Sequence, residues 1–122
     1  MASIVATAAL ISALLPAPAP SGRLDLAVHD GQSAGGRVLA AATLTCEPSG
    51  GSHPDAAAVC ERLAAAGGDI SKIPNSGGFC PMIFMPVTVT ASGSWKGHPV
   101  SFTKTYGNRC MADIAAGGLF HF

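Results

Sequence analysis

One segment of the chain has the residue spacing of a hydrolase nucleophile. Gly31-Gln32-Ser33-Ala34-Gly35 places a serine between two glycines, as in the sharp turn that exposes a catalytic serine. That chemistry needs a strand-to-helix turn in a much larger sheet, with a histidine and an acid beside the serine. Here the motif lies between two short segments with strand character, and its glycines favour a hairpin turn. A hydrolase that uses Ser33 is therefore a weak rival hypothesis, and we expect that the protein is not an enzyme.

The histidines and cysteines do not have the spacing of a metal site. The four histidines are His29, His53, His98 and His121. The spacing Cys46-x6-His53-x6-Cys60 matches no common zinc motif. The chain also lacks a phosphate-binding glycine motif and a basic patch, and lysine plus arginine equal aspartate plus glutamate at seven each. We therefore expect no metal, no cofactor and no nucleic-acid partner.

The four cysteines instead favour disulfides. They are Cys46, Cys60, Cys80 and Cys110. An even number of cysteines behind a secretory leader is typical of a disulfide framework formed in an oxidising compartment. Of the three possible pairings, the local one, Cys46 with Cys60 and Cys80 with Cys110, is the simplest. By the chain-entropy argument each such bond stabilises the fold by roughly 3–4 kcal/mol.

The start of the chain resembles a secretory leader. Residues 8–15 are an apolar stretch, and Ala17-Pro18-Ala19 has the small residues of a cleavage region, although no lysine or arginine precedes Arg23. Prolines interrupt the apolar run before the ~20 residues that a transmembrane helix needs. We therefore expect residues 1–22 to be a signal peptide or disordered leader and residues 23–122 to form one domain. The mature protein would be secreted, extracellular and free of the membrane.

Residues 77–86 concentrate large apolar side chains in a stretch that suits neither a helix nor a central strand. These side chains are Phe79, Met82, Ile83, Phe84 and Met85. Pro81 and Pro86 each remove a backbone donor, which excludes a central strand and disfavours a helix. We expect an extended apolar loop anchored at Cys80. Exposed apolar patches usually mark binding sites, and a stiffened extended peptide has the shape that a protease cleft accepts.

This loop predicts a protease inhibitor that presents itself as a substrate. The disulfide at Cys80 and the fixed φ of Pro81 would remove conformational freedom before binding, which raises affinity. Met82 would enter the specificity pocket, and a flexible apolar residue suits a broad hydrophobic pocket rather than a trypsin-like one. In the alternative interpretations Met82, Ile83 and Phe84 are strand core, or the loop is the partner or dimer surface of a non-inhibitory secreted module.

The elements that would carry this loop follow from periodicity. Residues 24–29 and 38–46 alternate or are rich in β-branched residues, which predicts two strands paired as a hairpin. Pro54 suits the first position of a helix capped by Ser52 or His53. The residues expected on the buried face of that helix are Ala56, Val59, Cys60 and Leu63. Gly67-Gly68 would end the helix.

The second half of the chain reads mainly as strands. Residues 87–90 predict a strand, Ser92-Gly93 a turn, and residues 95–106 a long returning strand. A short helix is expected over residues 108–116 and a short closing strand over residues 119–122. The fold class expected is therefore α+β, with a five-stranded antiparallel sheet and two helices.

Three stretches carry the motifs of a known family in order. They are Thr43-Leu44-Thr45-Cys46 with Pro48, Gly51, His53-Pro54 and Cys60; then Cys80-Pro81-Met82 with Pro86-Val87; then Gly93, Trp95, Gly97, Tyr106, Asn108, Cys110, Phe120 and Phe122. Over residues 23–122 the sequence resembles the Streptomyces subtilisin inhibitor family. The resemblance implies a secreted homodimer formed through a five-stranded sheet. It also implies that the first cysteine pairs with the second and the third with the fourth, Cys46–Cys60 and Cys80–Cys110.

The resemblance further implies inhibition of subtilisin-like serine proteases, with the reactive bond at Met82–Ile83. Chymotrypsin-like enzymes are further candidate partners. The protease-binding loop would comprise Phe79, Cys80, Pro81, Phe84 and Met85, with Phe79 in a distal apolar subsite. Asn108, beside Cys110, is a candidate for a hydrogen bond that supports the loop. Met85 departs from the family, which often has an acidic residue there, and so does the pair Thr103-Lys104.

Overall fold

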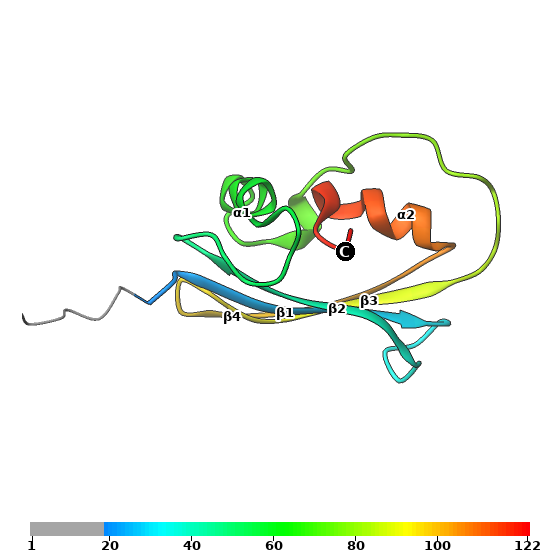
Figure 1. Ribbon diagram of the computed structural model, residues 1–122, viewed down its shortest axis with the longest axis horizontal. Coiled ribbons are helices and arrows are strands. Elements are labelled where there is room, and N and C mark those ends of the chain that lie inside the picture. Colours follow the sequence, from blue (N-terminus) through cyan, green and yellow to red (C-terminus); the bar gives the residue numbers. More distant parts are fainter. Residues whose placement is uncertain (1–18) are drawn as a thin grey trace, which may run out of the picture.

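A four-stranded antiparallel sheet with helices on one face forms the body of the molecule (Figure 1). The computed structural model describes residues 19–122. In chain order the elements are β1 (Gly22–Asp30), β2 (Val38–Cys46), α1 (Ala56–Ala65), the 3₁₀ helix η1 (Ile70–Lys72), β3 (Val87–Trp95), β4 (His98–Tyr106), α2 (Arg109–Ile114) and the 3₁₀ helix η2 (Ala115–Gly118). The strands lie in the order β2-β1-β3-β4.

The hairpin expected at the start of the domain is confirmed. β1 pairs antiparallel with β2 on one side and with β3 on the other, so it lies inside the sheet. Leu24, Leu26 and Val28 alternate with more exposed residues and are buried beneath the helices. Because side chains alternate between the faces of a strand, this pattern fixes which face of the sheet is covered by the helices. The register shifts between Val28 and His29, where β2 carries one extra residue.

The turn expected at Ser92-Gly93 is wrong, because β3 continues to Trp95. Gly93 lies within the strand, paired with Leu24 of β1 and Val100 of β4. Its φ is +152°, and a Cβ there would lie 1.9 Å from the carbonyl oxygen of Arg23. The glycine therefore permits a close approach of two strands. The turn comes at Lys96-Gly97, where both residues have positive φ, as a tight two-residue hairpin requires.

Helix α1 begins at Ala56, two residues after the expected first position. The residue before it is Asp55, whose side chain makes no capping hydrogen bond. Instead, the buried His53 accepts a hydrogen bond from Asp55 N at Nδ1 and donates from Nε2 to Leu119 O at 2.9 Å. Ser52 Oγ accepts from Thr43 N. Both residues expected to cap the helix therefore tie it to other segments.

The helix ends near Gly67 and Gly68, which both have positive φ, as expected. Its inward face is also as expected. Val59, Cys60 and Leu63 are buried and Ala56 packs against the core.

The closing strand expected over residues 119–122 is wrong, so the sheet has four strands rather than five among the described residues. Ala116 and Gly117 adopt positive φ within η2 and turn the chain sharply. Leu119 and Phe120 then both lie in the core, with no exposed surface. Phe120 stacks on Phe102 of β4 at 5.9 Å between ring centroids. Burial of two consecutive side chains does not match the alternation of a strand.

Both disulfides have the local pairing. Cys46–Cys60 joins the end of β2 to α1, with 5.4 Å between the Cα atoms. Cys80–Cys110 joins the segment before β3 to α2, with 5.7 Å between the Cα atoms. The first bond fastens a helix to the sheet, and the second fastens an otherwise irregular segment to the other helix. Both pairings are therefore confirmed, together with the α+β class and its two α-helices.

Candidate functional site

The segment between η1 and β3 is an exposed loop that arches away from the body (Figure 1). Met82 is 99% exposed and Phe79 is 92% exposed. Phe84, Met85 and Ile83 are 72%, 71% and 54% exposed. The interpretation that these residues are strand core is therefore wrong. Among residues 19–122, the loop is the largest departure from the rule that large apolar side chains are buried.

The loop is nevertheless fixed at its N-terminal end. Ser76 donates to Ile114 O, the last residue of α2, from its backbone N at 2.8 Å and from its Oγ at 3.2 Å. Gly77 N donates to Asn75 Oδ1 at 2.7 Å, which closes a small turn. Four residues after Ser76, Cys80 is bonded to Cys110 of the same helix. The chain therefore approaches Met82 from two attachments to α2.

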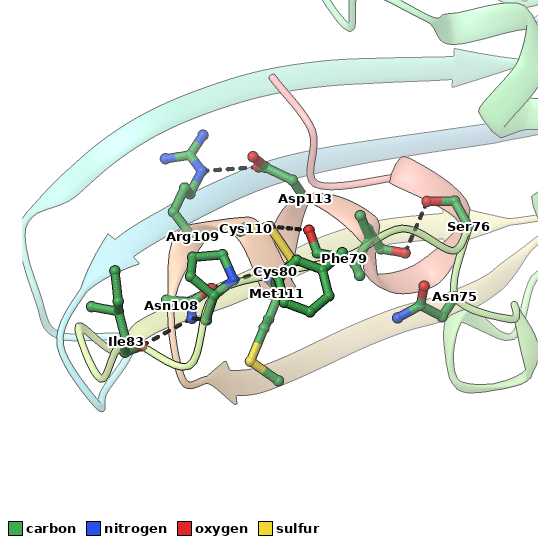
Figure 2. Close-up of a disulfide and its surroundings, with 12 residues drawn as sticks. Asn75, Ser76, Phe79, Cys80, Ile83, Asn108, Arg109, Cys110, Met111 and Asp113 are labelled. Carbon is green, nitrogen blue, oxygen red and sulfur yellow. Dashed lines mark hydrogen bonds and ion pairs between the residues drawn. A yellow bond between two sulfur atoms is a disulfide. The ribbon is translucent and has the colours of Figure 1, made fainter.

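Asn108 fixes the centre of the loop (Figure 2). Its side-chain nitrogen Nδ2 donates to Pro81 O at 3.0 Å and to Ile83 O at 2.9 Å. Its Oδ1 accepts from Met111 N at 2.9 Å and so caps α2. Asn108 is 7% exposed, and both of its amide protons and its oxygen are used. The carbonyl groups on either side of Met82 are therefore held by one buried side chain.

The C-terminal end of the loop is held by backbone groups. Met85 N donates to Gly107 O at 2.9 Å, and Pro86 O accepts from Gly31 N at 2.9 Å. The second bond joins the loop to the turn between β1 and β2. From Ser76 to Pro86 the exposed segment is thus attached to α2, to the residues before α2 and to a hairpin of the sheet. Such attachments reduce the conformational freedom that a flexible peptide would lose on binding.

Helix α2 is itself held in place. Arg109 Nε donates to Asp113 Oδ1 at 3.2 Å, one turn along the helix. Arg109 Nη2 donates to Phe122 O at 2.6 Å, so the end of the chain is bonded to the start of the helix. Both residues of the ion pair are about one third exposed, so the stabilisation is modest. The arrangement gives the disulfide and Asn108 a fixed platform.

Charge has little part in the surface of the loop. Residues 73–95 contain no charged side chain. In the part of the chain that the structure describes, two groups have displaced pKa values, and both lie outside the loop. The hydroxyl of Ser71 lowers the pKa of Asp69, and burial raises the pKa of Tyr106. The loop therefore offers a partner apolar contact and backbone hydrogen bonds rather than ion pairs.

Ser33 does not have the geometry of a catalytic serine. It lies in the β1–β2 turn, where its Oγ accepts a hydrogen bond from Gly35 N at 3.1 Å. The nearest histidine in sequence, His29, is bonded to Gly36 O and to Thr90 Oγ1. Over residues 19–122 no group of three histidine, cysteine or acidic side chains is placed to hold a metal. None of the helices described is long and apolar enough to cross a membrane.

Several supports of the loop have no side-chain signature and were not predicted. Ile114, Gly107 and Gly31 contribute backbone atoms only. Asn108 was predicted as a support, and the structure adds that it bonds two carbonyls rather than one. The loop residues expected from the sequence all lie together on this exposed segment.

The chain is similar to protease inhibitors of Streptomyces. Residues 19–108 match the family model described as "Subtilisin inhibitor-like". "Subtilisin inhibitor-like protein 4" of Streptomyces lavendulae is 41% identical over 106 residues, covering 85% of this chain and 91% of the relative. A "Putative serine protease inhibitor" of Streptomyces avermitilis is 48% identical over 77 residues, which cover 63% of this chain and 52% of that protein, about half its length.

A solved structure has the same fold. It is Streptomyces caespitosus sermetstatin in complex with Bacillus licheniformis subtilisin, with a TM-score of 0.69 and 31% sequence identity, covering 83% of this chain and 98% of that chain. The family model matches most of the chain, and the matched residues include the four strands, helix α1 and the exposed loop. The chain belongs to the subtilisin inhibitor-like family.

Proposed function

We propose that this protein is a secreted inhibitor of subtilisin-like serine endopeptidases, with Met82–Ile83 as the reactive bond. One observation carries the proposal. The side chain of Met82 is almost completely exposed, while Asn108 holds the backbone carbonyls on both sides of it. A protease needs the first feature to bind the residue and an inhibitor needs the second to resist release. Family membership and the sermetstatin–subtilisin complex support the class of partner.

The proposed mechanism follows from what happens at one peptide bond. The protease serine attacks the Met82 carbonyl carbon, and the oxyanion hole binds the developing charge on its oxygen. The bond to Ile83 then breaks, leaving an acyl-enzyme on Met82 and a free amine on Ile83. Because Asn108 bonds the carbonyls of Pro81 and Ile83, that amine stays beside the ester. Re-formation of the peptide bond therefore competes with hydrolysis.

Specificity in this proposal lies in side chains that the loop projects outward. Met82 enters an apolar primary pocket, and Phe79 fills a more distant apolar subsite on the N-terminal side. Subtilisin-like enzymes, and chymotrypsin-like enzymes with an apolar pocket, are the partners that fit a methionine. Met85 contributes an apolar contact where an acidic residue is common in the family.

The test is a titration of purified protein against subtilisin, followed by mass spectrometry after an acid quench. We expect stoichiometric inhibition and a single cut after Met82. Met82→Asp should weaken inhibition on the order of 100-fold or more, because a carboxylate would enter an apolar pocket. Met85→Asp is the matched control and should cost about tenfold, because Met85 contacts the protease without entering its primary pocket. If the two variants lose affinity equally, the loop is a general apolar partner surface rather than an inhibitor loop.

We further propose that the mature protein is an extracellular homodimer that associates through the uncovered face of the sheet. A row of small side chains crosses the centre of that face, from Ala41 through Ala27 and Thr90 to Thr103. The helices lie on the opposite face (Figure 1). Small side chains allow two sheets to pack closely. Light scattering should give twice the chain mass, and Thr90→Arg should give the monomer mass.

The predicted leader belongs to the same proposal. Residues 1–18 lie outside the described residues, and β1 begins at Gly22. Gly22, the last residue assigned to the predicted leader, is paired with Cys46 and Trp95 in the sheet, so the proposed cleavage precedes it. Expression in a secreting host, with sequencing of the N-terminus of the exported protein, tests the leader directly.

A further inference from the structure

A hollow of about 330 Å³ opens between the exposed loop and the β1–β2 hairpin. Its wall is mostly apolar, and it lies on the C-terminal side of Met82. The residues that line it are Asp30, Leu39, Pro81, Ile83, Met85, Val87, Asn108, Arg109 and Cys110. Figure 2 draws Ile83 at this end of the loop, away from Asn75 and Ser76. The hollow is therefore continuous with the segment that a bound protease would cover.

The loop presents two different faces along one extended backbone. Pro81, Ile83 and Met85 line the hollow, whereas Met82 points into solvent with 99% of its surface exposed. This alternation is the period-two pattern of extended chain. Met82 and the residues of the hollow therefore point to different sides of the loop. A protease that binds Met82 reaches the hollow past Ile83 and Met85, which are 54% and 71% exposed.

Leu39 is placed in the wall of the hollow by a β-bulge. Val28 of β1 pairs with Ala40 of β2 and His29 pairs with Val38, so Leu39 has no partner across the strands. Bulges interrupt the alternation of a strand and redirect a side chain. Leu39 remains 41% exposed. The exposed leucine therefore makes no cross-strand pair that would explain a large apolar side chain at this position.

The bulge and the loop are held at a fixed separation. Gly31 N donates to Pro86 O, which ties the hairpin to the end of the loop, and Asp30 N donates to Arg37 O at 2.8 Å, which closes the hairpin. Arg109, the cation in the wall, is already engaged by Asp113 and Phe122. The hollow is thus preformed, and its one cationic group is paired.

We propose that this hollow receives an apolar side chain of the bound protease, from the part of its cleft that contacts residues after the reactive bond. Leu39 is then a specificity-determining residue outside the loop. This inference rests on the proposed function. Burial of Leu39, Ile83 and Met85 by one apolar group would remove all three from water, so proteases with an apolar residue at that position are bound more tightly than proteases with a charged one.

The experiment compares two carboxylates on adjacent residues of β2. Leu39→Asp puts a charge in the wall of the hollow. Val38→Asp puts the same charge on a residue that is 53% exposed and does not line the hollow. We expect the dissociation constant for subtilisin to rise about tenfold or more for Leu39→Asp, because a charge in an apolar contact must be desolvated. For Val38→Asp we expect a change of less than about twofold.

Two further measurements make each outcome decisive. Thermal unfolding compares the stability of the variants, and Leu39→Ser carries the test if Leu39→Asp fails to fold, with an expected loss of about threefold to tenfold. Equal dissociation constants for the Leu39 and Val38 variants, with the parent still inhibiting and still cut after Met82, would overturn this inference and leave the proposed function intact. A parent that does not inhibit subtilisin would overturn both.

Discussion

Replacement of Asn108 tests the physical basis of inhibition most directly. The residue performs two separable tasks, since Nδ2 holds the carbonyls of Pro81 and Ile83 while Oδ1 caps α2 through Met111 N. Asn108→Ala removes both. Asn108→Ser keeps a good helix cap but its side chain is too short to span the two carbonyls. The difference between the variants therefore separates support of the loop from stability of the helix.

The expected magnitudes follow from the number of bonds lost. Each hydrogen bond contributes about 1 kcal/mol net, so losing the two bonds to the loop costs about 2 kcal/mol, or roughly 30-fold in an equilibrium constant. Loss of the cap costs about a further 1 kcal/mol in unfolding free energy for Asn108→Ala alone. Pro81 and Ile83 are exposed residues, so we expect their carbonyl oxygens to bond water in the variants and add no larger penalty for an unpaired buried group.

The assay measures how long inhibition lasts. Each variant is mixed with subtilisin, with the variant in slight molar excess. The return of protease activity is then followed together with the fraction of the variant that is cut after Met82. We expect both variants to be degraded roughly 30-fold faster than the parent, because the new amine is no longer held beside the acyl group. Both variants should melt at a lower temperature than the parent, because both lose the two loop bonds, and Asn108→Ala should melt lowest, because it also loses the cap. If Asn108→Ser inhibits as durably as the parent, Asn108 does not hold the cleaved ends together and the mechanism is wrong.

Two other changes probe the same machinery. Replacing both Cys80 and Cys110 with serine should destabilise the fold by about 4 kcal/mol and convert durable inhibition into temporary inhibition. Replacing Cys46 and Cys60 should destabilise the fold by about 3 kcal/mol but leave the pattern of cleavage unchanged. Denaturant unfolding measures the loss of stability, and the cleavage time course measures the duration of inhibition. Met82→Lys should shift inhibition from subtilisin toward trypsin, because a trypsin-like pocket binds a cation; an unchanged inhibition profile against the two enzymes would mean that Met82 does not occupy the primary pocket.

Much of the fold was predictable because its signals are local. The alternation in β1, the apolar face of α1 and the glycines after it depend on neighbouring residues, and the structure agrees with each. The errors came where tertiary contact decides. Gly93 is a turn residue by type, yet it lies inside β3. Glycine is needed there because the carbonyl oxygen of Arg23 leaves no room for a Cβ. No pattern within ten residues of Gly93 contains that information.

The end of the chain was misread for a related reason. Leu119 to Phe122 has the composition of a strand, but Ala116 and Gly117 with positive φ turn it beneath the helices. Leu119 and Phe120 then fill the core side by side, and His53 fixes the segment from a distant loop. Apolar composition predicted burial correctly. It did not predict the backbone path, because the path depends on a histidine far away in sequence.

The candidate site shows the same division between side chains and backbone. Residue type and position predicted that Phe79 and Met82 are exposed on the loop and that Asn108 is bonded to it, and the structure agrees on these placements. Gly31, Gly107 and Ile114 support the loop only through backbone atoms, which every residue type provides. A peptide with the sequence of residues 77–86 would keep the apolar contacts but none of these attachments, nor the disulfide. It would pay the full entropy of ordering on binding and would lose its cleaved ends by diffusion, as any substrate does. The property that separates an inhibitor from a substrate therefore lies in the scaffold, and variants of that scaffold should alter the duration of inhibition without altering which protease is recognised.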